Sequence, residues 1–181
     1  MKRNILDTAI QVLSYFGAVI TAALILLFIN TFIILNARVP SGSMEPTLQK
    51  QCRIVGYRMA YEKESPQRYD VIIFRYPDDN EKRFIKRIIG LPGDRIDIRD
   101  GSVYVNEKKT DEDFCMMPSS TDGGNLHYPF TVPRNSYFVL GDNRKKSNDS
   151  RYWNGHFVYI GEIEAKALII YYPFYDFGII H

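Results

Sequence analysis

The chain has few of the residues that build disulfide scaffolds, metal sites and histidine-dependent active sites. Among its 181 residues are two cysteines, Cys52 and Cys115, and three histidines, His127, His156 and His181. Two cysteines are too few for a disulfide framework and have no metal-type spacing, although a single bridge between them is left open. None of the histidines lies in a recognisable ligand cluster, and no Gly-x-Ser-x-Gly motif is present. The sequence therefore implies no metal and no cofactor.

Clustered charge of one sign is also missing. The formal net charge is +2 at pH 7, and the scattered lysines and arginines argue against nucleic acid as a partner. Mild basicity is equally compatible with a position beside anionic lipid. The length leaves room for one membrane segment and one globular domain of roughly 140 residues, which can bury a core without disulfides or metals.

What the chain does have is one long uncharged segment, residues 8–37, of which residues 17–35 are almost continuously apolar. A helix needs roughly 20 such residues to cross a hydrocarbon core about 30 Å thick. A cleaved signal peptide has a shorter apolar core and small residues at its cleavage site, so an uncleaved anchor is favoured. Lys2 and Arg3 precede the segment, and the positive-inside rule then predicts a cytoplasmic N-terminus. We expect residues 1–37 to hold the N-terminus and transmembrane anchor, with residues 38–181 outside.

Beyond the anchor the sequence has short runs of β-branched and aromatic residues, which are typical of strands. These runs lie at residues 71–74, 83–89, 103–105, 137–140 and 167–172. Turn-forming residues separate them, and no later segment has a long helical period. We predict a mainly β fold, a single N-terminal transmembrane helix followed by an antiparallel β domain. Residues 110–133 are polar and are expected to form an excursion or small subdomain, to which the sequence assigns no role.

Two serines, Ser41 and Ser43, lie on a turn-prone loop just after the apolar segment. A serine hydroxyl needs a base to act as a nucleophile. Without a supported histidine, the other option is a lysine kept neutral by burial. A free lysine with a pKa of about 10.4 is neutral in only about 4 of 10,000 molecules at pH 7.

Lys86 is the best candidate for this base. If residues 84–89 form a strand, alternation puts Phe84, Lys86 and Ile88 on one face, while Arg87 points to solvent. The alternative is that Lys86 and Arg87 form an exposed basic pair on an edge strand, and spacing alone favours it.

A polar loop at residues 141–151 mixes turn formers, hydroxyls and opposite charges. Asp149 and Arg151 could pair and hold the loop, and Ser147 could hydrogen-bond an amine. Taken alone, a solvated loop with local side-chain-to-backbone bonds is the favoured interpretation.

These three clusters, in this order behind an apolar anchor, resemble the type I signal peptidases. The resemblance covers most of the chain and is carried by four motifs, which are Pro40-Ser41-Gly42-Ser43-Met44-Glu45-Pro46-Thr47-Leu48, Asp70-Val71-Ile72-Ile73-Phe74-Arg75-Tyr76-Pro77, Phe84-Ile85-Lys86-Arg87-Ile88-Ile89-Gly90-Leu91-Pro92-Gly93-Asp94 and Gly141-Asp142-Asn143-Arg144 through Ser147-Asn148-Asp149-Ser150-Arg151. One motif alone is a weak signal, whereas four in order are specific.

The resemblance implies a serine endopeptidase with Ser43 as nucleophile and Lys86 as general base. It assigns the oxyanion hole to the Ser41 hydroxyl and the Ser43 backbone N–H. It also implies that Ser147 orients the Lys86 amine. The remaining support is an ion pair that holds the loop, formed by Asp149 and Arg151.

The same resemblance implies the substrate and the location. The enzyme would remove N-terminal signal peptides from secreted preproteins after small residues at −1 and −3. Its partners would be these signal peptides, membrane lipid and the secretion machinery, at the plasma membrane as a single-pass protein with its catalytic domain outside. An extended substrate would add a strand beside the Lys86 or Ser43 segment. The pockets for the small residues would be lined by Val39, Pro40, Met44, Leu48, Phe84 and Ile85.

Two alternatives stay open from the sequence. One is a self-cleaving serine–lysine protease of the SOS-repressor type, against which the anchor and the lack of a DNA-binding helical lead both count. The other is a non-catalytic anchored β domain that acts in adhesion or surface assembly. The chain also departs from the signal-peptidase pattern. Tyr69 stands where glycine is common, and Lys145-Lys146 replaces a more acidic or amide pair, which could help keep Lys86 neutral or could displace the loop.

Overall fold

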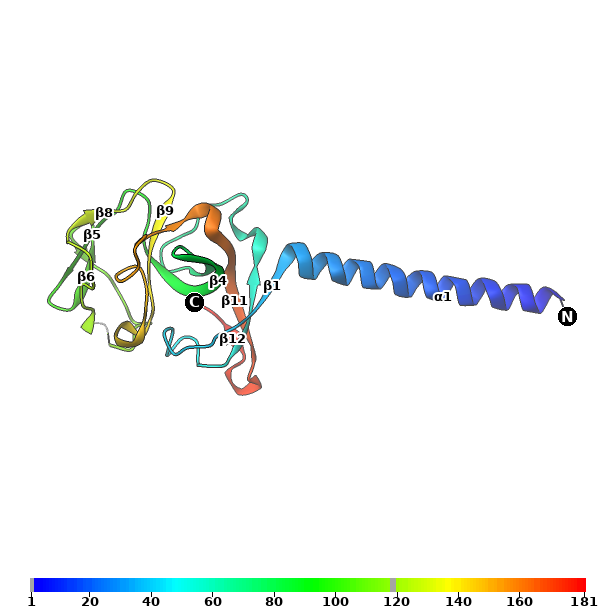
Figure 1. Ribbon diagram of the computed structural model, residues 1–181. Coiled ribbons are helices and arrows are strands. Elements are labelled where there is room, and N and C mark those ends of the chain that lie inside the picture. Colours follow the sequence, from blue (N-terminus) through cyan, green and yellow to red (C-terminus); the bar gives the residue numbers. More distant parts are fainter. Residues whose placement is uncertain (1, 118–119) are drawn as a thin grey trace. The chain divides into compact units, whose positions relative to one another are not determined.

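The computed structural model describes residues 2–117 and 120–181, and the chain divides into two compact units, Met1–Ile34 and Leu35–His181. In the first unit, helix α1 (Lys2–Phe28) continues as a π-helical stretch, Ile29–Ile33 (Figure 1). The span Leu13–Ile33 has 21 residues, a mean hydropathy of 2.3 and none of its side chains buried, so it is long and apolar enough to cross a membrane.

The second unit contains a larger antiparallel sheet whose strands run in the order β1-β2-β11-β3-β4-β9-β10, with β12 paired to β11. Its strands are β1 (Ile34–Arg38), β2 (Arg53–Tyr57), β3 (Val71–Tyr76), β4 (Asp79–Gly90), β9 (Ser136–Leu140), β10 (Val158–Tyr159), β11 (Ile163–Tyr172) and β12 (Gly178–Ile179). The strand that matters most for the site is β4, which lies between β3 and β9, although β9 pairs with it only from Arg87 onward.

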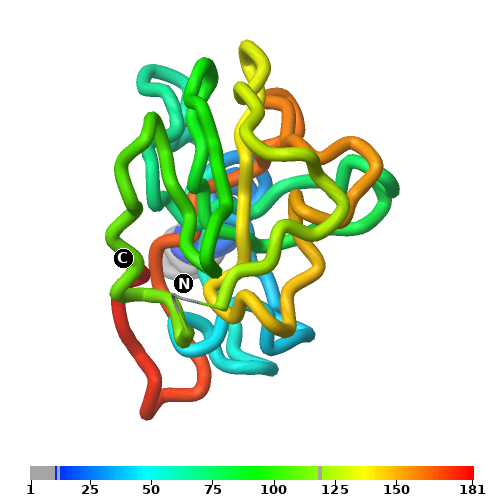
Figure 2. The backbone as a smooth tube through the Cα atoms, turned by 90° about the vertical axis from the view of Figure 1, so that its left-hand side faces the viewer, coloured from blue at the N-terminus to red at the C-terminus, as the bar shows by residue number. Residues whose placement is uncertain are grey.

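A smaller sheet has the order β7-β6-β5-β8 and lies at one side of the domain (Figure 1), the side that faces the viewer in Figure 2. Its strands are β5 (Arg95–Arg99), β6 (Ser102–Val105), β7 (Lys108–Lys109) and β8 (Phe130–Thr131). Strand β8 lies within residues 110–133 and pairs with β5. The polar segment is thus an excursion that leaves the small sheet and returns to it.

Strand pairing explains how β4 comes to be covered on both faces. Ile73 pairs with Ile85 and Ile72 pairs with Lys86, and successive residues on a strand point to opposite faces. Ile73 and Ile85 belong to one apolar cluster, whereas Ile72 belongs to another that contains the buried Trp153. Any polar side chain in this part of β4 is therefore placed inside the protein.

The mainly β prediction is confirmed, and each predicted run lies within or overlaps a strand, namely β3, β4, β6, β9 and β11. The sequence analysis did not single out β1, β2 or β5, although Ile96 and Ile98 alternate with polar residues in β5. Within residues 35–117 and 120–181 the only helices are short 3₁₀ turns. Cys52 and Cys115 are both buried and free, so the bridge left open by the sequence is not formed.

Candidate active site

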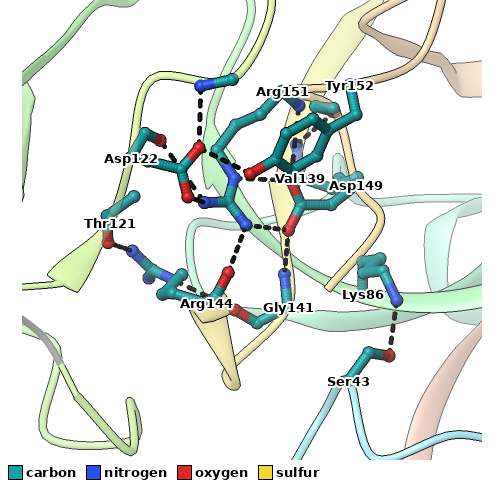
Figure 3. Close-up of polar contacts among 12 residues, drawn as sticks. Ser43, Lys86, Thr121, Asp122, Val139, Gly141, Arg144, Asp149, Arg151 and Tyr152 are labelled. Atoms are coloured by element: carbon teal, nitrogen blue, oxygen red, sulfur yellow. Dashed lines mark hydrogen bonds and ion pairs between the residues drawn. The ribbon is translucent and has the colours of Figure 1, made fainter. Parts of the chain in front are cut away.

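The side chains of Ser43 and Lys86 meet inside the catalytic domain. Lys86 Nζ lies 2.7 Å from Ser43 Oγ (Figure 3), and the two residues are only 4% and 6% exposed. Phe84 and Lys86 share a strand face as predicted, and the amine lies 5.5 Å from the Phe84 ring centroid. The alternative of an exposed basic pair is wrong, because Lys86 and Arg87 are only 4% and 1% exposed.

Ser43 is held in place by the residues that follow it in the loop and by a hydrogen bond to its own carbonyl. Met44 and Leu48 are fully buried in the core, and the Leu48 N–H donates to the Met44 carbonyl at 2.8 Å. From the other direction the Asn143 N–H donates to the Ser43 carbonyl at 3.0 Å. A methyl group on Gly141 would lie 2.4 Å from that same carbonyl oxygen, so only glycine allows this approach.

Ser41 lies beside the nucleophile candidate. Its hydroxyl donates to Ser43 Oγ at 3.2 Å. Across residues 2–117 and 120–181, no group accepts a hydrogen bond from the Ser43 backbone N–H. The assignment of the Ser41 hydroxyl and the Ser43 N–H to an oxyanion hole stays a prediction, because such donors must point to the substrate carbonyl oxygen.

Burial lowers the pKa of Lys86 from its ordinary value to about 8. Desolvation is the largest cause, since a buried ammonium loses its hydration. Asp149 and Asp142 act in the opposite direction, and Arg151 favours the neutral amine. With a pKa near 8, about one molecule in eleven holds a neutral amine at pH 7, against about 4 in 10,000 for a free lysine. Lys145 and Lys146 are exposed and are not among these causes.

Arg87 corrects a prediction. The sequence placed it in solvent, but its side chain is 1% exposed and forms an ion pair with Asp142, whose side chain is equally buried, at 2.8 Å. Its guanidinium also donates to Thr47, to the Tyr69 carbonyl and to the His181 carbonyl. The alternation was right, but the opposite face of β4 is also covered, so the charge is buried and paired instead of solvated.

Tyr69, where the family resemblance leads one to expect glycine, has a φ of 73°. This left-handed conformation favours glycine, because a Cβ crowds the following carbonyl. The ring centroids of Tyr69 and Phe114 lie 5.4 Å apart, and this contact offsets part of the cost of the left-handed backbone.

The 141–151 loop is buried rather than solvated. Asp149 and Arg151 form the predicted ion pair, at 2.8 Å between Oδ1 and Nε, with both side chains fully buried (Figure 3). Asp149 also accepts from the Gly141 N–H at 3.0 Å. Lys145 and Lys146 are exposed, and Lys146 lines the groove beside Ser43 and Lys86.

Ser147 does not make the contact with the Lys86 amine that the sequence predicted. It is 6% exposed and packs against Gly141, as expected for a group behind the amine. Its hydroxyl, however, has no hydrogen-bond partner in the described part of the chain. Lys86 instead directs its amine to Ser43, so the orienting role of Ser147 stays a prediction.

A groove of about 320 Å³ opens beside Ser43 and Lys86. Five predicted substrate-binding residues line it, which are Val39, Pro40, Met44, Phe84 and Ile85. Leu48 does not line the groove, and its side chain is fully buried in the core. Three basic residues that the sequence did not single out for the groove also line it, namely Arg38, Arg83 and Lys146.

Other residues around the site were missed by sequence reasoning. Asp142 and Arg144 lie in the last of the four motifs, yet their spacing gave no partner. Their partners are Arg87, which was expected in solvent, and Glu112, which is 32 residues away from Arg144. Charge balance was the only signal, since a buried charge requires a partner.

Comparison with known proteins identifies the family of the chain. Residues 12–172 match the family described as signal peptidase, peptidase S26. A probable signal peptidase I-2 of Synechocystis is 38% identical over 159 residues, covering 85% of this chain and 70% of that protein. A signal peptidase I of Bacillus caldolyticus is 35% identical over 174 residues, covering 91% of each chain. The crystal structure of a signal peptidase I from Enterococcus faecalis has a TM-score of 0.46 and 37% identity, covering 57% of this chain and 97% of that one.

The chain therefore belongs to the signal peptidase, peptidase S26 family. It is a serine peptidase, which excludes the non-catalytic alternative, and the membership supports signal-peptide removal as its activity. Its apolar helix fits a membrane-anchored protein.

Proposed function

We propose that the chain is a membrane-bound endopeptidase that removes N-terminal signal peptides from secreted preproteins through a Ser43–Lys86 dyad. The observation that carries the proposal is the 2.7 Å contact between the buried Lys86 amine and Ser43 Oγ. A neutral amine at this distance can accept the hydroxyl proton. The lowered pKa of Lys86 makes that neutral form accessible near neutral pH.

The reaction proceeds through an acyl-enzyme. Lys86 takes the proton of Ser43 as the oxygen attacks the scissile carbonyl, and the new C–O bond places negative charge on the carbonyl oxygen. Ser41 Oγ–H and the Ser43 N–H stabilise this oxyanion. When the C–N bond breaks, protonated Lys86 gives its proton to the leaving amine. The neutral amine then takes a proton from a water molecule as the water oxygen attacks the ester carbonyl. When the C–O bond to Ser43 breaks, Lys86 returns this proton to Ser43 Oγ, and the signal peptide leaves as a carboxylic acid.

The loop supports the base in two ways. Ser147, which is buried and unpartnered within the described residues, is free to hydrogen-bond the amine once its proton has moved. The Asp149–Arg151 pair keeps the loop in place. Within this pair Asp149 raises the pKa of Lys86 and Arg151 lowers it, so its contribution is to hold the loop and not to tune the base.

The groove supports cleavage after small residues at −1 and −3. Its walls beside the dyad are formed by Val39, Met44 and Ile85, whose apolar side chains leave room for small substrate residues. Strand β9 pairs with β4 only from Arg87 onward. The edge of β4 that precedes Lys86 on that side can therefore receive an extended peptide as an added strand.

The membrane supplies the context. Lys2 and Arg3 before the apolar span predict a cytoplasmic N-terminus and a catalytic domain outside the plasma membrane. Membrane lipid is a second partner, because the loop between β11 and β12 exposes large apolar side chains, with Phe174, Tyr175 and Phe177 at 83%, 88% and 66%. Aromatic residues are enriched at the membrane interface. Preproteins arrive from the secretion machinery, which is the third partner.

Cleavage of a purified precursor tests the dyad. The full chain in detergent is expected to cut a precursor with an Ala-x-Ala site, and Ser43→Ala and Lys86→Ala are each expected to lower the rate by about 10³-fold or more. The wild-type rate should rise with pH around an apparent pKa of about 8, because the neutral amine is the base.

Folding of both variants is checked by the fluorescence of the single tryptophan, Trp153, which is buried at 1%. A folded variant that retained full activity would remove that residue from the mechanism. Cleavage at sites with large −1 residues would contradict the proposed selection for small substrate residues.

A further inference from the structure

Residues 110–133, for which the sequence gave no role, reach the catalytic loop through a buried ion pair. Glu112 and Arg144 have side chains that are 3% and 0% exposed. The carboxylate accepts two hydrogen bonds, from Arg144 Nη2 at 2.8 Å and from Nη1 at 3.1 Å. This bidentate geometry is the strongest and most directional that a carboxylate and a guanidinium can form.

Arg144 in turn closes the catalytic loop on itself. Its Nε donates to the Gly141 carbonyl at 3.0 Å, and its own carbonyl accepts from Arg151 Nη2 at 2.8 Å (Figure 3). Gly141 is the residue that packs against both the Ser43 carbonyl and Ser147. One guanidinium therefore connects the small-sheet excursion to the backbone that lies against the nucleophile.

The excursion contacts the loop at further points. Arg144 Nη1 donates to Thr121 Oγ1 at 2.8 Å, and the Met116 N–H donates to the Asp142 carbonyl at 3.3 Å. At the far end of the loop, the Asn125 N–H donates to the Arg151 carbonyl at 2.9 Å. Glu112 and Thr121 are not groove-lining residues. These contacts act behind the site and do not touch the substrate.

We propose that Glu112 is a positioning residue of the peptidase, which acts through Arg144 to fix residues 141–147 against Ser43 and Lys86. A buried ion pair resists rearrangement, because separating it leaves an uncompensated charge in a medium of low dielectric constant. Catalytic groups must be held within about 0.5 Å of their productive geometry. The inference rests on the proposed dyad. It assigns to the 110–133 segment the function of holding the 141–151 loop in position.

The test measures kcat and KM of the full chain in detergent on a short peptide that carries the Ala-x-Ala site. Glu112→Gln keeps the shape of the side chain and removes its charge. We expect kcat to fall about 10- to 100-fold, while KM changes little, because the groove is untouched and only the catalytic geometry is loosened. The matched control is Glu107→Gln, an exposed carboxylate that pairs with Arg95 and Arg99 and should retain wild-type kinetics.

A second variant separates positioning from stability. Glu112→Leu/Arg144→Met removes both buried charges together and should recover much of the thermal stability that Glu112→Gln loses. Its kcat should stay low, because the Gly141 carbonyl and Thr121 lose their donor. If Glu112→Gln does not fold, this double variant and the milder Thr121→Val provide the test, the latter with a smaller loss of kcat.

A wild-type kcat in folded Glu112→Gln, or a kcat that recovers together with stability in the double variant, would overturn the inference. Failure of the proposed dyad is recognised separately, since folded Ser43→Ala or Lys86→Ala would then cleave the same peptide at the wild-type rate.

Discussion

Lys86 and Arg87 are neighbours on β4, both are cations and both are buried, yet the two faces of the strand treat them differently. Arg87 faces a carboxylate and has its guanidinium occupied by hydrogen bonds. The Lys86 amine contacts a neutral hydroxyl, Ser43 Oγ, as its hydrogen-bond partner. Burial with a counterion produces a fixed structural charge, whereas burial without a contacting one produces a base. The difference lies in what covers each face and in the side chains themselves, since a guanidinium stays charged whereas a buried amine can lose its proton.

The largest expected effect on stability comes from removing the cation of the Arg87–Asp142 ion pair. Arg87→Met leaves Asp142 buried without its partner, and we expect a loss of about 3–5 kcal/mol in the free energy of unfolding. The measurement is denaturant unfolding of the full chain in detergent, followed by Trp153 fluorescence. A loss below about 1 kcal/mol would show that Asp142 takes a proton or another partner at no real cost.

Substituting methionine for Lys86, the buried cation that contacts no counterion, should instead raise the free energy of unfolding. Lys86→Met removes an amine whose pKa is about 8 when folded and 10.5 as the ordinary value. Below pH 8 both states are protonated, and folding carries a penalty on the order of 3 kcal/mol. Between pH 8 and 10.5 the unfolded chain binds more protons, so the wild-type stability contributed by this group rises with pH.

Lys86→Met is thus expected to be inactive and more stable than wild type at pH 7, with the difference shrinking towards pH 10.5. Unfolding curves of both proteins at pH 7, 9 and 10 provide the check. A constant difference across this range would mean that the folded pKa of Lys86 is not lowered.

The smallest expected effect concerns Tyr69, whose carbonyl accepts from Arg87. Tyr69→Gly relieves a positive φ but adds freedom to the unfolded chain and removes the ring contact with Phe114, so stability should change by less than about 1 kcal/mol. Cleavage should be unaffected, because the carbonyl that faces Arg87 remains. A large loss of activity would show that the phenol ring, rather than the backbone, holds the paired face of β4.

The sequence predicted the residues of the dyad, but not the state of their surroundings. Alternation correctly placed Phe84 and Lys86 on one face, because the period of a strand is a local property. It could not show that Arg87 is buried, since that depends on Asp142, which is 55 residues away. Leu48 lay in a motif beside the groove, yet its side chain turns into the core. Glu112 gave no signal at all, because a lone acidic residue in a polar segment is ordinarily solvated.

The proposed use of Lys86 as the base also decides which chemical reagents can inactivate the enzyme. His127, His156 and His181 do not line the groove that the described residues form. Compounds that inactivate serine proteases by alkylating a catalytic imidazole therefore find no target beside Ser43. An effective covalent inhibitor would instead need an electrophile that Ser43 attacks directly, on an extended scaffold with small side chains. Its potency would increase with pH, in step with the neutral amine.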